Sequence, residues 1–347
     1  MSTARNLKIE DFTYELPDKR IARYPLAVRD AAKLLHYKKR KIEDHHFTDL
    51  PKLLPYGTLL IGNATRVIHA RLHFITDNDK TIEIFCLDPV DPVDYQQTFA
   101  ATEKVIWKCL VGGNRKWKRD PATLTVNIGE DEISLSVRRI ERVDNAFHIE
   151  FSWADERYSF GQLLDAAGNI PLPPYLGRDA EASDQERYQT VFAHTEGSVA
   201  APTAGLHLSE RLMEELKQQN MNWAEVLLHV GAGTFKPVTA PTLGGHEMHA
   251  EYFEVDRLFL ERLAAQLQSG QPIVSVGTTS TRCLESLYYI GSLLSQGKLE
   301  LTKEPVQLEQ WVATDHVHSI TPLAAIQALL SALRLQSSNV LNGSTQL

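Results

Sequence analysis

Two histidines in the middle of the chain stand beside turns rich in glycine and small residues. His207 ends the segment Ala200-Ala-Pro-Thr-Ala-Gly-Leu-His, and His229 begins the segment His-Val-Gly-Ala-Gly-Thr-Phe235. An imidazole exchanges protons near neutral pH, and the backbone amides of a glycine turn can hold an anion. The first segment has too little charge for a solvated loop, so its backbone is expected to approach either a ligand or a neighbouring element closely.

The second segment follows a run, residues 224–230, that has the apolar composition of a buried strand. Gly231, Gly233 and Thr234 then form a GxGT turn. This turn does not match the longer glycine fingerprint of dinucleotide-binding folds. His229 lies inside the apolar run, where a structural role competes with a catalytic one, and we therefore favour His207 as the proton-transfer residue.

A third junction has the same design. Residues 272–276 predict a short strand, and Gly277-Thr-Thr-Ser-Thr-Arg282 opens a helix. Hydroxyls and an arginine at a helix N-terminus suit a phosphate, a carboxylate or a ribose. The alternative is that the hydroxyls of residues 278–281 only cap the helix.

His246, His249 and Glu251 form a His-x-x-His-x-Glu pattern that suggests a metal site. The histidines are three residues apart rather than four, so the pattern is not the helical HExxH zinc motif. We favour an acid–base or substrate-anchoring role for the two histidines.

The elements that position these residues predict a mixed α/β fold with an inserted domain. Five β-rich runs without an intervening helix occupy residues 81–87, 105–111, 123–128, 133–140 and 146–153, which indicates a small barrel or sandwich. We expect an all-β domain over residues 76–155 inside a larger α/β domain formed by residues 1–75 and 156–347. Apolar spacing in that domain predicts a helix behind Ser209, one ending near Gly270 and one over residues 322–333.

Composition fits a globular cytoplasmic protein. The 347 residues are 43% apolar and 23% charged, the three cysteines form no CxxC pair, and no apolar run approaches the length of a membrane span. A net charge of −8 argues against non-specific nucleic-acid binding. Two local basic clusters, residues 38–41 and residues 107–119 with two tryptophans, suit either base stacking with backbone contact or an ordinary solvated hairpin.

Taken together, the motifs resemble the S-adenosylmethionine:tRNA ribosyltransferase-isomerases of queuosine biosynthesis. Besides the three junctions and the His246 segment, the resemblance rests on residues 12–17, 21–25, 63–67, 70–72, 170–175, 187–190 and 284–286. The order and spacing of these motifs carry it, and it implies the same architecture of a large mixed domain with a smaller all-β insertion.

The chain departs from the family pattern at several positions. Where the family usually has Asn-Asp-Thr-Arg, this chain has Asn63-Ala-Thr-Arg66, and the family's Ser-Arg after Arg29-Asp30 is replaced by Ala32-Lys33. The family's Gly-Leu-His-Phe ends in Leu208 in this chain, and its Thr-Phe-Arg-Pro is replaced by Thr-Phe-Lys-Pro237. The family's C-terminal motifs do not occur in these 347 residues. We therefore consider two possibilities, a truncated or degenerate member and an incomplete chain.

The resemblance implies that the ribosyl part of S-adenosylmethionine is transferred to, and isomerised on, 7-aminomethyl-7-deazaguanine in tRNA. Epoxyqueuosine forms, and adenine and methionine are released. The reaction needs a base beside the sulfonium, a proton donor for adenine and support for developing charge. The sulfonium is its own leaving group, so we expect no metal and no cofactor beyond S-adenosylmethionine as co-substrate. The expected partners are tRNA and S-adenosylmethionine, without a membrane, for a monomer.

The candidate residues divide into two groups. The catalytic candidates are His207, Glu285 as a base or as the partner of Arg282, Tyr188 as a nucleotide-orienting group, and His229. The substrate-binding candidates are Arg66, Tyr175, Thr203, Gly205, Gly231, Gly233, Thr234, His246, His249, Thr278, Thr279 and Arg282. Arg66 and Arg282 suit a tRNA phosphate or the methionine carboxylate.

Two other functions compete with this one. A catalytically weakened relative that still binds tRNA or a nucleoside would explain the lost carboxylate at position 64. An ordinary S-adenosylmethionine methyltransferase is disfavoured, because no glycine-rich strand–helix unit with a following acidic residue occurs near the start of the chain.

Overall fold

A computed structural model describes residues 3–235, 238–315 and 320–347. The chain divides into two compact units, the first formed by residues 1–65, 189–195 and 202–347, and the second by residues 66–188 and 196–201. Each unit has its own sheet and core. The mixed helix and strand content agrees with the α/β class expected from the sequence.

The first unit is built around a six-stranded mixed sheet. The strand order is β14 (Ile273–Ser275), β3 (Leu59–Asn63), β12 (Asn222–Leu228), β13 (Glu251–Asp256), β16 (Val340–Thr345) and β15 (Val306–Leu308). The three strands β14, β3 and β12 run parallel, whereas β13 is antiparallel to β12. Parallel strands end at a common edge, and that edge is where ligands bind in open α/β sheets.

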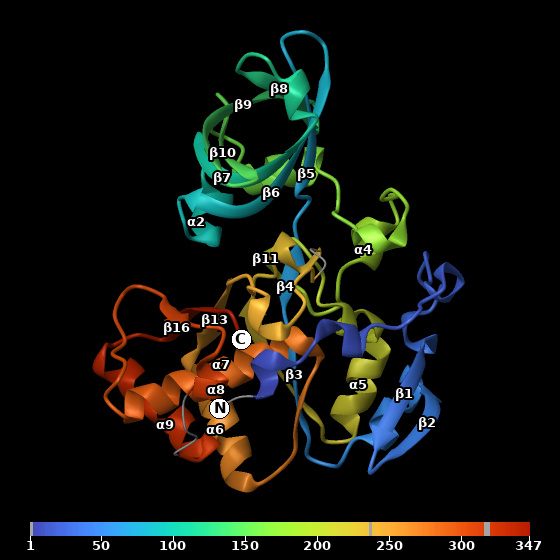
Figure 1. The fold of residues 1–347 in the computed structure, drawn as a ribbon, viewed down its shortest axis with the longest axis vertical. Coiled ribbons are helices and arrows are strands. Elements are labelled where there is room, and N and C mark those ends of the chain that lie inside the picture. The colour runs from blue at the N-terminus through green and yellow to red at the C-terminus, as the bar shows by residue number, and fades with distance from the viewer. Residues whose placement is uncertain (1–2, 236–237, 316–319) are drawn as a thin grey trace. The chain divides into compact units, whose positions relative to one another are not determined.

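Helices of the first unit pack against this sheet and one another. α6 (Arg257–Ser269) and α9 (Pro322–Leu335) contact each other, and α9 also contacts α7 (Gly277–Ser295) (Figure 1). The shorter helices are α1 (Leu50–Leu53), α5 (Glu210–Gln218) and α8 (Val312–Asp315). Within the described ranges, none of the helices combines the length and apolar character needed to span a bilayer.

Three predicted helices are confirmed, two of them with the predicted boundary residue, which is Ser209 before α5 and Gly270 after α6. Ser209 accepts a hydrogen bond from the amide of Leu212 at the start of α5. Gly270 ends α6 with a φ of 68°, the left-handed conformation that glycine adopts at low cost. α9 begins at Pro322 behind Thr321, whose side chain accepts from Ala324.

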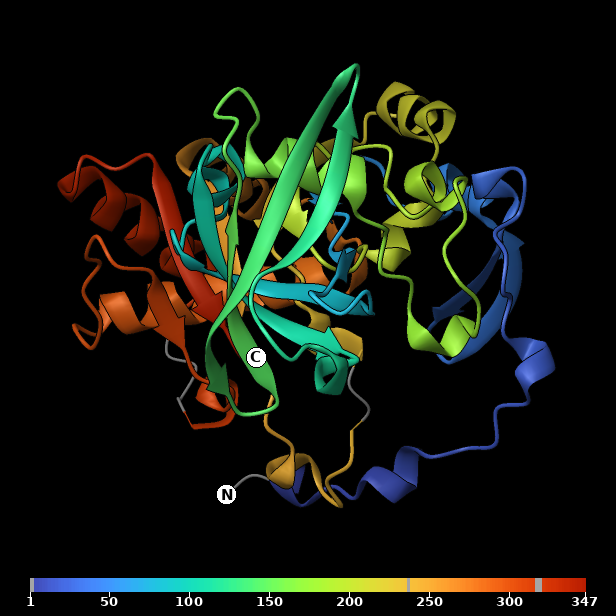
Figure 2. The ribbon, with the colours of Figure 1, turned by 90° about the horizontal axis from the view of Figure 1, so that it is seen from above.

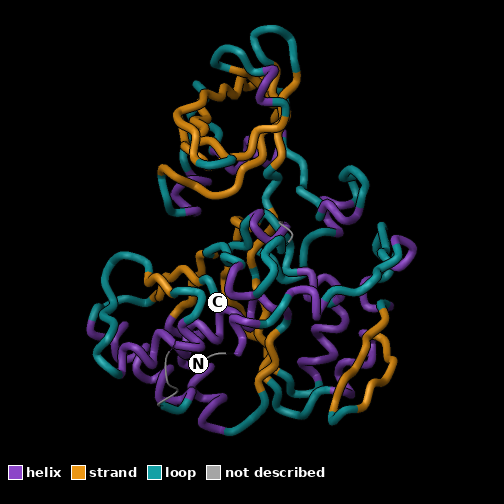
Figure 3. Tube along the Cα trace, viewed as in Figure 1, coloured by secondary structure: helices purple, strands orange, loops and turns teal. Residues whose placement is uncertain are grey.

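The second unit contains a closed barrel, visible as a ring of strands in Figure 3 and from above in Figure 2. Its six strands are β5 (Arg71–Ile75), β6 (Thr81–Asp91), β7 (Lys104–Gly112), β8 (Ala122–Ile128), β9 (Asp131–Val143) and β10 (Ala146–Ser152). The five strands predicted from the sequence are present. The sixth, β5, precedes the expected boundary at residue 76, and its burial alternates along the strand as a barrel requires.

One expectation about the barrel segment was wrong, and one of the two interpretations of its basic cluster does not fit the structure. A helix, α2 (Tyr95–Ala100), interrupts the strands, because Asp94 caps its N-terminus and buried Tyr95 and Phe99 contact Trp107. The tryptophans of the basic cluster are not free to stack on bases. Trp107 is fully buried in the barrel, and Trp117 is 2% exposed with the Arg139 guanidinium over its ring.

The remaining elements are small. In the second unit, α3 (Phe160–Ala167) inserts Phe160 among Trp107, Phe151 and Trp153 of the barrel, and α4 (Asp184–Arg187) precedes Tyr188. β4 (Thr65–Val67) pairs with β11 (Thr195–Ser198). In the first unit, β1 (Lys33–Lys38) and β2 (Lys41–His46) form a separate two-stranded hairpin.

Candidate functional site

Asn63 ties together the ends of two parallel strands. Its amide nitrogen donates to the Leu228 carbonyl at 2.8 Å, and its side-chain oxygen accepts from the Leu228 amide at 3.0 Å. The same oxygen accepts from the amide of Thr65. This buried amide therefore fixes the carboxyl ends of β3 and β12, from which two of the sequence-predicted segments depart.

The segment that contains His207 forms a 3₁₀ helix, Thr203–His207, against the start of α7. A Cβ added to Gly277 would lie 3.3 Å from the Cβ of Ala204, and Gly277 has a φ of 88°. A Cβ added to Gly205 would lie 2.8 Å from the Phe192 ring. The close approach predicted for this backbone is therefore made to neighbouring elements of the protein.

The GxGT turn packs against His249. A Cβ on Gly233 would lie 2.5 Å from Cγ of His249, so the imidazole occupies the space that any larger residue would need. Thr234 is exposed, and Lys236 and Pro237, where the chain departs from the family pattern, lie outside the described residues. The turn thus sets the position of the His249 ring.

His249, Glu251 and Arg282 form a hydrogen-bonded network. His249 Nε2 lies 2.9 Å from Glu251 Oε1, and Arg282 Nη1 donates to Glu251 Oε2 at 2.6 Å. Arg282 Nη2 donates to the carbonyl oxygens of His249 and Thr345, both at 2.8 Å. The Glu251 side chain is 4% exposed and that of Arg282 is 10% exposed, so this ion pair is largely shielded from solvent.

Burial and the Glu251 carboxylate act in opposite directions on Arg282. Desolvation lowers the pKa of the guanidinium and is the larger effect, while Glu251 raises that pKa. Arg282 Nε is shielded from solvent and has no hydrogen-bond partner among the described residues. Nη2 uses both of its N–H groups within the network and Nη1 uses one, so a ligand could meet the guanidinium through Nε, through the second N–H of Nη1 or by displacing an existing contact.

His207 has an environment suited to a neutral imidazole. Its side chain is half-buried against the ring of Phe47, with ring centroids 4.7 Å apart. Burial is the largest effect and lowers the pKa of His207, a hydrogen bond to the Arg29 backbone opposes it, and the charge of Arg29 adds the smallest effect, which again lowers the pKa. Arg29 is itself fixed by donation to the carbonyl oxygens of Gln189 and Leu206.

The hydroxyls at the start of α7 do not cap it. The N-cap position is Val276, while Ser280 and Thr281 donate back to the carbonyl oxygens of Val276 and Gly277. Thr278 is exposed, and Thr279 Oγ1 is shielded from solvent without a hydrogen-bond partner. Capping therefore does not explain these hydroxyls, and Thr279 keeps an unused hydrogen-bonding group.

Three further candidates of the first unit, Glu285, His229 and His246, are not part of the His249–Glu251–Arg282 hydrogen bonds given above. Glu285 is exposed on α7 and, among the described residues, forms no ion pair with Arg282, whose carboxylate partner is Glu251; the pairing that we considered is wrong. His229 is 5% exposed and lies beside the Tyr252 ring, as expected for a structural histidine. His246 is held through its carbonyl oxygen, which accepts from Gln310.

Three candidates belong to the second unit. Arg66 is exposed on β4, and Tyr175 is 64% exposed just after the Pro-Leu-Pro-Pro run. Tyr188 is 7% exposed, and burial raises the pKa of its phenol above the usual range. The phenol is therefore protonated at neutral pH and can act as a hydrogen-bond donor.

The candidate set omitted two acidic residues. Glu251 was considered only as a possible metal ligand, although the spacing to His249 was visible in the sequence. Glu196 was not selected at all, yet burial raises the pKa of its carboxyl, and the neighbouring Asp165 raises it further against Arg66 and His69. A raised carboxyl pKa at a strand end marks a candidate acid.

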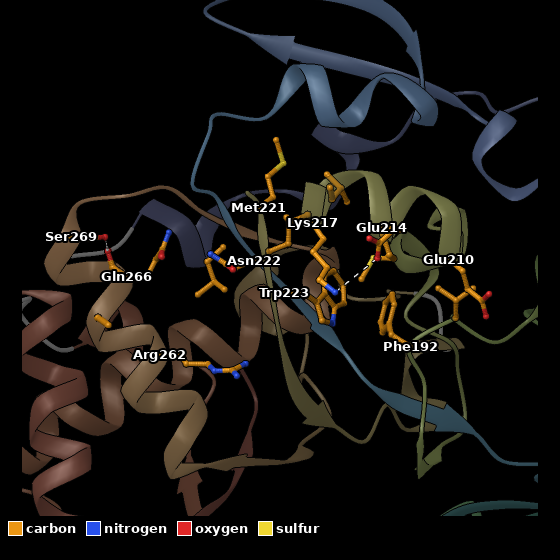
Figure 4. A pocket seen from close by; sticks show the side chains of 16 residues that line it. Phe192, Glu210, Glu214, Lys217, Met221, Asn222, Trp223, Arg262, Gln266 and Ser269 are labelled. Carbon is orange, nitrogen blue, oxygen red and sulfur yellow. Dashed lines mark hydrogen bonds and ion pairs between the residues drawn. The ribbon is translucent and has the colours of Figure 1, made fainter. Parts of the chain in front are cut away.

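A large cavity of the first unit lies away from this edge. It has a volume of about 890 Å³, and its lining includes Leu59 and Asn222, the first residues of β3 and β12 (Figure 4). Figure 4 shows Trp223, Phe192, Met221 and Arg262 around it. Because it adjoins the amino ends of the parallel strands, we take the carboxyl-end network and not this cavity as the candidate site.

The comparison with protein families now decides the identity. A family model described as queuosine biosynthesis protein matches residues 9–341. The chain belongs to this family. The match spans nearly all of the described residues, and the family predicted from the motif order is confirmed.

Curated relatives in the family carry an enzyme name. A protein of Aromatoleum aromaticum named S-adenosylmethionine:tRNA ribosyltransferase-isomerase is 37% identical over 297 residues, covering 85% of this chain and 80% of the relative. A protein of Thermotoga petrophila with the same name is 38% identical over 283 residues, covering 81% and 77%. The family is thus one of enzymes, as the sequence predicted.

A solved structure is also similar. The crystal structure of the S-adenosylmethionine tRNA ribosyltransferase from Thermotoga maritima is 24% identical, with a TM-score of 0.34, covering 94% of this chain and 92% of that one.

Proposed function

We propose that this protein is an S-adenosylmethionine:tRNA ribosyltransferase-isomerase that acts on 7-aminomethyl-7-deazaguanine in tRNA and forms epoxyqueuosine. The observation that carries the proposal is the family membership, with relatives of that name aligned over most of the chain. S-adenosylmethionine is the co-substrate, and the chemistry requires no further cofactor. A tRNA substrate favours a cytoplasmic location, and the monomeric state stays a prediction.

The reaction defines what the side chains must do. The aminomethyl nitrogen loses a proton and bonds to a ribosyl carbon, a new carbon–carbon bond closes the cyclopentane ring, and the ring oxygen exchanges one of its two carbon bonds for a new one that completes the epoxide. The bonds from the ribosyl carbons to adenine and to the methionine sulfur break. A base takes the proton beside the sulfonium, adenine leaves with a proton, and methionine leaves as a neutral thioether. The protein must therefore supply one acceptor and one donor near the ribosyl group.

His207 is our candidate for the base. Its lowered pKa keeps the imidazole unprotonated at neutral pH, which a proton acceptor requires. It lies in the 3₁₀ helix that packs on α7, beside Thr203 and Gly205, which are candidates for binding the ribose, Thr203 through its hydroxyl.

The His249–Glu251–Arg282 network supports a second role. When Nε2–H of a neutral His249 donates a hydrogen bond to Glu251, Nδ1 of the same ring is an acceptor with a fixed orientation. We assign His249 to substrate anchoring or proton transfer, and Arg282 to positioning Glu251. Thr279 and Thr278, through their hydroxyls, and the turn formed by Gly231, Gly233 and Thr234 are candidates for binding the methionine carboxylate.

The other predicted residues receive subsidiary roles in the proposal. In the second unit, Arg66 is a candidate for a tRNA phosphate, Tyr175 for stacking on a nucleotide and Tyr188 for hydrogen bonding to it. His246 remains a binding candidate, and His229 and Glu285 remain catalytic candidates of lower rank for the reasons given above.

An adenine-release assay tests the proposal. The protein is incubated with S-adenosylmethionine and tRNA carrying the deazaguanine precursor, and mass spectrometry follows the anticodon nucleoside. We expect adenine together with the epoxyqueuosine mass. Release of S-adenosylhomocysteine with a methylated nucleoside would instead show a methyltransferase.

The variant His207→Gln tests the assigned base. We expect turnover to fall about 10²–10⁴-fold, the usual contribution of general acid–base catalysis. His148→Gln is the matched control, because His148 pairs with Glu141 on the barrel and belongs to neither candidate group. Normal turnover by a folded His207→Gln protein would remove His207 from the mechanism.

One observation favours a catalytically weakened relative as the second candidate function. Ala64 stands where the family pattern has a carboxylate, and it is fully buried, with its amide donating to the Val226 carbonyl. A folded protein that binds the tRNA but releases no adenine would support this alternative.

A further inference from the structure

A second histidine–glutamate cluster lies on the hairpin formed by β1 and β2. It is far along the chain from the His249–Glu251–Arg282 network. The antiparallel register pairs His36 with Glu43 and Leu34 with His45. Because side chains alternate along a strand, His36, Glu43 and His45 share one face of the hairpin. Their side chains are 24%, 56% and 27% exposed.

The distances within this cluster are those of ligands around an ion and longer than those of hydrogen bonds. His36 Nδ1 and His45 Nε2 each lie 3.6 Å from the same atom, Glu43 Oε2. Three other histidine–glutamate pairs of the protein have hydrogen-bond distances of 2.8–2.9 Å, and His73 Nε2 lies 3.7 Å from Glu83 Oε2. The hairpin cluster differs from all four pairs because two imidazoles face the same carboxylate oxygen. Bonds of about 2.1 Å in a tetrahedral zinc site separate neighbouring ligand atoms by about 3.4 Å.

The two nitrogen atoms also lack any other use. His36 Nδ1 and His45 Nε2 are shielded from solvent and make no hydrogen bond with any described residue. Candidate ligand atoms of all three residues lie within 4.8 Å of one another, and in the part of the chain that the structure describes no other group of three histidine, cysteine, aspartate or glutamate side chains has this arrangement. Shielded imidazole nitrogens without a partner are costly unless something binds them.

We propose that His36, Glu43 and His45 bind a zinc ion, with water completing the coordination. Two imidazoles and one carboxylate are a ligand set that zinc accepts in proteins. The site is separate from the proposed ribosyl-transfer chemistry, which needs no metal, and it does not depend on that function.

The metal stabilises the hairpin. A lone two-stranded sheet is at best marginally stable in water, and this one carries three side chains that are each 66% exposed on its other face: Leu35, Tyr37 and Ile42. The tight turn places Lys39 and Arg40 at positive φ, a conformation with a cost for both residues. An ion that joins β1 to β2 holds the register against these costs.

Zinc titration of the untagged, chelator-treated full chain tests the proposal. We expect one zinc ion per chain with affinity in the micromolar range or tighter, and a decrease of more than about tenfold in His36→Gln, Glu43→Gln and His45→Gln. Asp44→Asn is the matched control, because Asp44 is an exposed carboxylate next to Glu43 on the opposite face, and it should bind zinc as the unmodified chain does.

Two measurements on the unmodified chain keep the test independent of how the variants fold. X-ray absorption of the zinc-loaded protein should show two imidazoles and oxygen ligands, and zinc should slow hydrogen exchange at the β1 and β2 amides. Absence of stoichiometric binding, or binding that all three variants retain, would overturn the proposal. So would exchange protection that appears elsewhere and leaves the hairpin unchanged.

Discussion

The two histidine–glutamate clusters of the first unit use the same residue types in opposite ways. At the carboxyl end of the sheet, Glu251 is 4% exposed, and each of its oxygens has one partner at 2.6–2.9 Å. On the hairpin, Glu43 is 56% exposed, and two histidine nitrogens face one of its oxygens at 3.6 Å. The arginine in the first cluster makes the difference.

A guanidinium neutralises a buried carboxylate and directs its remaining oxygen, so the histidine beside it acquires a fixed tautomer and orientation. Without a guanidinium, the second cluster has one acidic oxygen and two imidazoles that converge on a common centre, which suits a cation. Residue type alone therefore does not distinguish a proton-transfer site from a metal site. The distinction comes from the third group in contact with the glutamate, which is a guanidinium in the first cluster and a second imidazole in the other.

The largest expected effect on stability comes from comparing two single variants, each of which removes the carboxylate of one cluster. Glu251→Gln leaves the Arg282 charge buried without its partner, and we expect a loss of about 3–5 kcal/mol in the free energy of unfolding. Glu43→Gln in metal-free protein should cost less than about 1 kcal/mol, because an exposed pair contributes little. Urea denaturation of both variants measures the difference. Equal losses would mean that Arg282 does not set the two clusters apart.

A smaller effect is expected from Gly233→Ala. The added methyl group would lie 2.5 Å from Cγ of His249, so the ring must move, and overpacking of this kind costs about 1–3 kcal/mol. Gly245→Ala is the control, since its nearest neighbour, the Cβ of Ala240, would be 3.5 Å away. Gly233→Ala should lower both the thermal denaturation midpoint and the rate of adenine release. Gly245→Ala should change neither quantity. Full activity of Gly233→Ala would argue that the orientation of His249 does not matter for turnover.

Local sequence signals predicted the fold best where a cap or an alternating pattern defined the element. Ser209 and Gly270 mark the start of α5 and the end of α6 as expected, and α9 begins at Pro322, the first residue of the predicted range. β16 was not predicted, because Val340-Leu-Asn-Gly-Ser-Thr345 reads locally as a turn. It becomes a strand by pairing with β13 and β15, and Gly343 leaves room for the fully buried ring of Phe253.

In the candidate site, too, local sequence signals predicted the segments but not the contacts between distant parts of the chain. The three junctions were recognised because each has its own glycines and hydroxyls. The structure joins the first to the third through Ala204 and Gly277, and the second to the third through His249, which packs on Gly233 and accepts from Arg282. Pairing of Arg282 with Glu285 was one of two alternatives from the sequence, but its partner is Glu251, 31 residues earlier in the chain. A partner supplied by sheet topology leaves no local pattern, and neither does the pairing of His36 with Glu43.

His207 extends the comparison to a histidine whose pKa is set mainly by burial, and it gives the smallest of the expected effects. Its folded-state pKa is lowered relative to about 6.5 in the unfolded chain, so the unfolded state takes up a proton first as the pH falls. Its contribution to stability is complete above pH 6.5 and is lost as the pH falls from there through the lower folded-state pKa.

Urea denaturation between pH 7.5 and 5 tests this expectation with His207→Gln beside the unmodified chain. The variant cannot take up the proton, so its stability should decrease less over this range, and the two curves should converge toward low pH. A parallel decrease in both proteins would show that other groups cause the pH dependence. In the adenine-release assay, the same lowered pKa should keep the proposed base active to a pH below 6.5, whereas an acid limb centred at or above 6.5 would point to a histidine in a different environment.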